Sequence, residues 1–260
     1  MTPMPLRLLI AALLVAPSTA AQPQLLISVL DQTGAPVTDL TTAGVSLDHD
    51  GAPLEVVSIT ALPTTVQVVA LFEGLAVTQR QLNSALTQFI SALDADSVVD
   101  MQSVDGPLDA AIMQAVGDLH DRGATHPVVI MLGQASEMAR SDFQSSQVRG
   151  RRQAADLTGD LDSVRDALAA HGIPLYGISV TDRPLENLTA LAIGSGGRFE
   201  IIGSPADFGD TLSGIGAELG HRYLLTYRAA NATAVPRVRV NQSDTVARAS
   251  HYRPTHKLPR

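Results

Sequence analysis

The 260-residue sequence contains no cysteine. The chain therefore forms no disulfide, carries no lipid-modified cysteine and offers no thiolate to a metal ion. Tryptophan is also absent and aromatic residues make up only 3% of the chain, which leaves too few flat side chains for a platform that stacks bases or sugars. The formal net charge is -8, and the arginines are scattered except for Arg149, Arg151 and Arg152, so the sequence shows no basic footprint of the kind that nucleic acids require. We therefore expect no nucleic-acid partner.

Long hydrophobic runs are missing too, apart from one short run near the start. After Arg7 an apolar stretch covers 8–16, and small residues follow it. A membrane-spanning helix needs roughly 20 apolar residues, so we predict a secretory signal peptide over 1–21, cleaved after Ala20 or Ala21. The alternative is a membrane anchor. We therefore expect an exported protein, periplasmic or secreted, with no membrane span after cleavage.

The rest of the chain shows two kinds of local pattern. Residues 22–62 are typical of β structure, with a hairpin signal at Asp50-Gly51. Over 63–229, apolar runs typical of buried parallel strands alternate with amphipathic helical patterns, which predicts a doubly wound α/β domain. Residues 230–260 return to β structure and end in a tail. Because neither β segment has enough strands to bury a face alone, we expect the two to pair into one small β-rich appendage.

Three segments inside the α/β region need separate predictions. We expect Arg222–Tyr227 to close the parallel sheet. The glycines in 194–197 follow a helical pattern and precede a strand, which is the reverse of a dinucleotide-binding loop, so they predict a helix end. The segment 134–159 is long, polar and weakly patterned, and is interpreted as a loop with a partial helix.

Several segments of the sequence resemble, in their order and spacing, those of one large protein family. They are "AAHGIPLYGISV", "LENLTALAIGSGGRFE", "LSGIGAELGHRYLLTY" and the β segments on either side. Together they resemble the von Willebrand factor A-like domains, in particular the secreted bacterial branch with flanking β segments. The resemblance implies a Rossmann-like fold that works mainly by binding other proteins. It also implies a metal-ion-dependent adhesion site at the carboxyl ends of the strands, made by an Asp-x-Ser-x-Ser loop, a threonine and an aspartate.

This sequence departs from that metal site at every matching position. The first loop carries Glu73, Leu75 and Val77, and the last two have no side-chain oxygen. Pro107 stands where the threonine is expected, and Gln134 lies near the position of the aspartate. A hard cation such as Mg²⁺ needs about six well-placed oxygen ligands. The resemblance therefore predicts the framework of the family with a degenerate metal site, and no metal or other cofactor.

The leading hypothesis for function is a non-enzymatic, metal-independent protein–protein interaction module of the bacterial envelope or secreted space. Its partner is another protein, bound at the loops that follow the strands. The candidate partner-binding residues are Phe72, Glu73, Leu75, Asp105 and Gln134. The alternative for Phe72 and Leu75 is that both simply pack inward.

Two other functions remain open. One is a cation-dependent adhesin with non-standard oxygen ligands, for which the candidates are Glu73, Asp105, Asp109 and Glu137. The other is a hydrolytic enzyme with an unrecognised site. Because the chain has neither a GxSxG turn nor a phosphate-binding loop of the GxxxxGK[ST] type, we expect no enzymatic activity.

Overall fold

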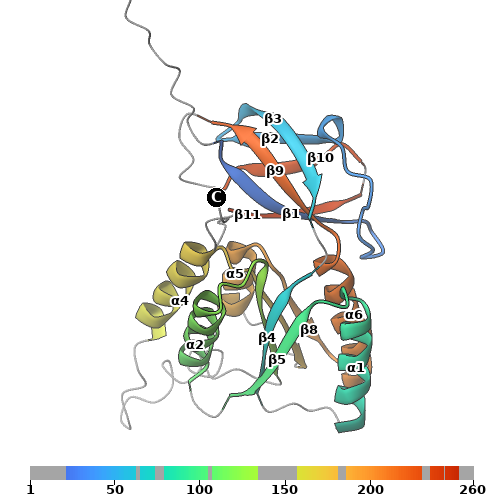
Figure 1. Ribbon diagram of the computed structural model, residues 1–260, viewed down its shortest axis with the longest axis vertical. Coiled ribbons are helices and arrows are strands. Elements are labelled where there is room, and N and C mark those ends of the chain that lie inside the picture. The colour runs from blue at the N-terminus through green and yellow to red at the C-terminus, as the bar shows by residue number, and fades with distance from the viewer. Residues whose placement is uncertain are drawn as a thin grey trace, which may run out of the picture.

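The computed structural model describes residues 22–62, 65–73, 79–104, 107–133, 157–180, 186–229, 235–242 and 244–251. These residues form two sheets, one parallel and one antiparallel, with helices on both faces of the parallel sheet (Figure 1). The predicted signal peptide lies outside the described residues, as does most of the segment 134–159.

The parallel sheet has five strands in the order β5-β4-β6-β7-β8. Its strands are β4 (Gln67–Glu73), β5 (Val98–Ser103), β6 (Pro127–Gly133), β7 (Leu175–Val180) and β8 (Phe199–Ile202). The central strands β6 and β7 are buried at every position, as expected for strands that are covered on both faces. The predicted α/β fold class, a doubly wound sheet with a β-rich appendage, is confirmed.

Helices cover the two faces of this sheet and enclose two hydrophobic cores. On one face lie α2 (Leu108–Asp121), α4 (Leu157–His171) and α5 (Glu186–Ser195). On the other face lie α1 (Gln79–Ser91) and α6 (Phe208–Leu219), the latter preceded by the short 3-10 helix η2 (Pro205–Asp207). Figure 1 shows α2 and α4 on the left of the sheet and α1 and α6 on the right. The apolar residues at helical spacing in the sequence are those that face these cores.

The antiparallel sheet has six strands in the order β10-β2-β3-β9-β1-β11. Its strands are β1 (Gln24–Leu30), β2 (Val45–His49), β3 (Ala52–Ala61), β9 (Arg222–Arg228), β10 (Arg237–Val240) and β11 (Val246–His251), with the 3-10 helix η1 (Thr42–Gly44) before β2. The terminal segments pair twice, β1 with β11 and β2 with β10. The predicted pairing of the two flanking β segments is therefore confirmed.

The prediction for Arg222–Tyr227 is wrong, because β9 does not join the parallel sheet. It lies between β3 and β1 and pairs antiparallel with both. Its inward residues alternate, with Tyr223, Leu225 and Tyr227 buried in the core of the antiparallel sheet. Alternation is typical of a strand with one buried face, and this period of two was the signal that the sequence interpretation passed over.

Two predicted chain reversals are confirmed. Asp50 and Gly51 both have positive φ, 51° and 81°, and join β2 to β3 in the type of hairpin that their sequence indicates. Gly196, with φ of 89°, follows α5 and leads into β8. The backbone N–H of Gly197 donates to the carbonyl of Ala192 (2.9 Å), so the glycine pair ends a helix, as predicted.

The antiparallel sheet lies at the amino ends of the parallel strands. Its strand β11 contacts Gly196, which comes just before β8, and its strand β1 contacts the end of α6. Figure 1 shows it at the top of the molecule, above the helices and the parallel sheet. The carboxyl ends of the parallel strands, where the sequence places the candidate binding face, are at the other end of that sheet.

None of the described helices combines the length and the apolar character that crossing a membrane requires.

Candidate functional site

The order of the parallel strands creates a switch point between β4 and β6. The chain runs from β4 to β5 on one side of the sheet and then crosses to β6 on the other. In open α/β sheets, ligands bind in the crevice outside the carboxyl ends of the two strands at such a point. Here those strands end at Glu73 and Gly133, which are paired in register. The geometry therefore selects the end of the sheet that the sequence selected.

Three adjacent strands, β5, β4 and β6, end at this edge of the sheet, where the sequence predicts the site. Phe72 pairs with Ser103 of β5 and with Leu132 of β6, so three strands end side by side. Phe72 is half-buried and packs against the core beneath α1 and α6, which is the inward packing that the sequence left as an alternative. Glu73 is the last residue of β4.

The other predicted contacts cannot be placed in the same way. The side chain of Glu73 and the whole of Leu75, Asp105 and Gln134 lie outside the described residues, as does Glu137. The structure thus describes the strands that lead to the candidate face and one of its side chains.

Two further described residues, Pro107 and Asp109, lie at the start of α2, at the same end of the parallel sheet. Pro107 stands at the N-cap of α2 and offers no side-chain oxygen, either as a cap or as a metal ligand. Asp109 lies in the first turn of α2, and its Oδ1 is buried and accepts no hydrogen bond from any residue that the structure describes. Across the described ranges, no three His, Asp or Glu side chains come together as a metal site would require.

A second polar site lies at the opposite end of the parallel sheet, between the two sheets. Its centre is Glu218 near the end of α6, which is 0% exposed. Its Oε1 accepts hydrogen bonds from the Ser28 hydroxyl of β1 (2.7 Å) and from the Tyr176 phenol of β7 (3.1 Å). We call Glu218 with Ser28, Tyr176, Arg198 and Arg248 the Glu218 cluster.

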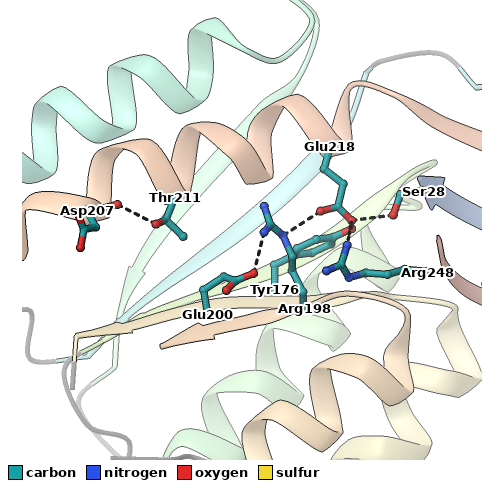
Figure 2. Close-up of polar contacts among 8 residues, drawn as sticks. All are labelled: Ser28, Tyr176, Arg198, Glu200, Asp207, Thr211, Glu218 and Arg248. Carbon is teal, nitrogen blue, oxygen red and sulfur yellow. Dashed lines mark hydrogen bonds and ion pairs between the residues drawn. The ribbon is translucent and has the colours of Figure 1, made fainter. Parts of the chain in front are cut away.

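The two arginines of the Glu218 cluster are held differently. The Nε of Arg198 lies 2.9 Å from Oε2 of Glu218, and its Nη1 donates to Oε1 of Glu200 at 2.7 Å. Arg248 of β11 is more distant, with Nη1 3.9 Å from Oε1 of Glu218. Figure 2 shows these side chains converging on Glu218 from both sheets. Arg222, at the start of β9, is also buried and close enough for its charge to act on Tyr176.

The electrostatics of the cluster keep Tyr176 neutral and donating. Burial, and after it the negative charge of Glu218, raises the pKa of the Tyr176 phenol far above its usual range. A neutral phenol keeps its proton and donates a hydrogen bond to the carboxylate, which is the contact observed. We call the parallel sheet with its helices the α/β layer. Because Ser28 and Arg248 belong to the antiparallel sheet, and Tyr176 and Arg198 to the α/β layer, the cluster ties these two layers together.

Sequence reasoning missed the Glu218 cluster, although one signal for it was present. The buried face of α6 carries Phe208, Leu212, Ile215 and Leu219 at helical spacing. Glu218 is three residues beyond Ile215 and therefore lies on the same apolar face. A carboxylate in such a position is seldom buried unless it is paired, which indicates a compensating cation elsewhere in the chain. The sequence alone does not say which arginine supplies it.

The comparisons with known proteins add little to this geometry. No protein-family model matches the chain, and no curated protein matches its sequence. Among solved structures, the chain is similar to the von Willebrand factor type A protein from Catenulispora acidiphila, with 8% sequence identity and a TM-score of 0.44. The match covers 90% of this chain and 72% of that one.

Proposed function

We propose that the chain is a non-enzymatic protein-binding module that engages another protein at the carboxyl ends of β4, β5 and β6, in the bacterial envelope or secreted space. The observation that carries this proposal is the switch point between β4 and β6, where Glu73 and Gly133 end paired strands. The antiparallel sheet lies at the amino ends of the strands, so it does not compete for this face. The candidate contacts are Phe72, Glu73, Leu75, Asp105 and Gln134.

Metal independence is the finer part of the proposal, and it rests on the donor chemistry. At the positions that match the metal ligands of von Willebrand factor A-like domains, Glu73 supplies the one carboxylate, while Leu75, Val77 and Pro107 contribute no side-chain oxygen. Mg²⁺ gives up its water shell reluctantly and needs near-ideal octahedral geometry. One carboxylate does not replace that shell, so the partner is expected to bind the protein surface directly.

The second candidate function is a cation-dependent adhesin, and one observation favours it. The buried Oδ1 of Asp109 has no hydrogen-bond donor among the described residues, and α2 begins at the same end of the sheet as Glu73. A buried carboxylate oxygen without a donor is costly, and a bound cation would satisfy it. Asp109 and Glu73 would then be ligands, together with Asp105 and Glu137.

Thermal unfolding with and without divalent cations separates the two candidates. A ligand that binds only the folded state stabilises it by about 2.7 kcal/mol at 100 times its dissociation constant. We expect melting curves of residues 22–260 in EDTA, in millimolar Mg²⁺ and in millimolar Mn²⁺ to overlay. A saturable rise in Tm that disappears in both Glu73→Ala and Asp109→Ala would establish the adhesin instead.

Affinity capture tests the binding face itself. Residues 22–260 are immobilised and exposed to an envelope extract of the producing bacterium, in EDTA and in Mg²⁺, as wild type, Glu73→Lys and Asp121→Lys. Asp121 is an exposed acidic residue at the opposite end of α2, so it controls for the change in charge. We expect one protein to be captured in both buffers, lost with Glu73→Lys and kept with Asp121→Lys. Equal capture by all three proteins would contradict the assignment of the face.

A further inference from the structure

A groove separates α5 and β8 of the α/β layer from β10 and β11 of the antiparallel sheet. Its volume is about 460 Å³, which lies within the range of small-molecule sites, roughly 300–1,000 Å³. It opens at the end of the molecule opposite to the candidate partner-binding face, beside the Glu218 cluster. The groove is therefore a separate site from the one proposed above.

The walls of the groove are mainly apolar and carry unusually exposed aliphatic side chains. Ile193 of α5 is 63% exposed, Val246 of β11 is 54% exposed, and Val235 just before β10 is 40% exposed. These residues come from different elements but line one groove. Apolar area left in water costs roughly 25 cal/mol per Å² relative to burial, so a ligand with an apolar body would be stabilised here.

The same groove is positively charged, in a chain whose net charge is -8. Its lining contains three arginines, Arg198, Arg237 and Arg248, and one acidic residue, Glu200, which gives a formal charge of +2. Arg198 already forms ion pairs with Glu200 and Glu218. Arg248 has one ion pair in the described part of the chain, at 3.9 Å, and Arg237 has none there. Two guanidinium groups thus keep donors for an anion.

From this combination we infer that the groove binds a small amphipathic carboxylate. Its apolar body lies along Ile193, Val235 and Val246, and its carboxylate is bound at the wall that carries Arg237 and Arg248. Arginine suits this role because its planar group can bind a carboxylate through two parallel hydrogen bonds. Since the lining comes from both layers, the bound ligand also holds the antiparallel sheet against the α/β layer.

The inference is tested with three probes of equal chain length, namely decanoate, 1-decanol and decylammonium, using calorimetry and thermal melts of residues 22–260. We expect decanoate to bind saturably and to raise Tm by about 5 °C at 100 times its dissociation constant. Decanol should bind about tenfold more weakly, which corresponds to the loss of one charged contact. Decylammonium should not bind, because the groove carries its own positive charge.

Surface variants locate the site without unfolding the protein. Ile193→Ser should weaken decanoate about tenfold, whereas Ile90→Ser is the matched control, since Ile90 is 50% exposed near the end of α1. Arg237→Gln, a change of an exposed residue, should weaken decanoate and leave decanol unchanged. The inference is overturned if decanol binds as tightly as decanoate, if Ile90→Ser weakens binding as much as Ile193→Ser, or if decanoate does not bind.

Discussion

Glu218→Gln tests whether the buried carboxylate holds the two layers of the molecule together. The substitution keeps the size of the side chain and one acceptor oxygen, but it removes the negative charge. The new amide nitrogen would then take the position of Oε2 and face the Nε of Arg198, now 2.9 Å away, as a donor facing a donor. If the amide is turned the other way, its nitrogen faces the hydroxyls of Ser28 and Tyr176 instead.

The expected cost follows from the environment of the group. Glu218 is fully buried, and removing one partner from a buried ion pair costs about 3–5 kcal/mol, because the remaining charge is left uncompensated. Arg198, which is mostly buried, and Arg222 are the cations that would lose this compensation. For a chain of this size, a loss of that order lowers Tm by about 10 °C.

Urea unfolding of residues 22–260, followed by far-ultraviolet circular dichroism, measures the change in the free energy of unfolding. Glu200→Gln is the matched control because Glu200 pairs with the same arginine at 2.7 Å but is 37% exposed. We expect that control to cost less than about 1 kcal/mol, as is usual for exposed pairs. If Glu218→Gln is no more destabilising than Glu200→Gln, the reasoning about the Glu218 cluster is refuted.

Two further predictions concern the same junction. Burial, and after it the charge of Arg222, lower the pKa of His126, so the folded state favours the neutral ring. Stability is therefore lost as pH falls through the unfolded pKa of 6.5. Tm should be lower at pH 5 than at pH 7, and this difference should be smaller in His126→Asn. An unchanged pH dependence in that variant would contradict this. Gly196→Ala should lower the free energy of unfolding, measured in urea, by about 1–3 kcal/mol, because φ of Gly196 is 89° and an added Cβ would collide with Ser250 of β11. Gly203→Ala is the control, since a Cβ added there meets no neighbour.

The candidate face was predictable from the sequence in its framework but not in its side chains. The strand before Glu73 is a continuous apolar run, and its burial and direction follow from that pattern. That Gly133 lies beside Glu73 depends on the strand order, in which β5 pairs with one edge of β4 and β6 with the other. Sequence periodicity indicates that strands exist, but it carries little information about their order.

The sequence by itself determined the local structure of this protein. The Asp50-Gly51 hairpin and the glycine end of α5 depend on backbone conformations that only a few residue types adopt easily, so a short stretch is enough to predict them. The apolar face of α6 is determined in the same way by helical spacing.

Only the tertiary structure decided which distant segments meet. It placed β9 in the antiparallel sheet rather than the parallel one, and it brought Ser28, Arg198 and Arg248 to the carboxylate of Glu218. It also formed the groove between β8 and β11. Hydrogen bonds within one turn or helix are specified by neighbouring residues. Strand partners and the compensation of a buried charge depend on how the whole chain folds, because the groups involved lie far apart in the sequence. Leu25 pairs with His251 across β1 and β11, and Ser28 and Glu218 are 190 residues apart.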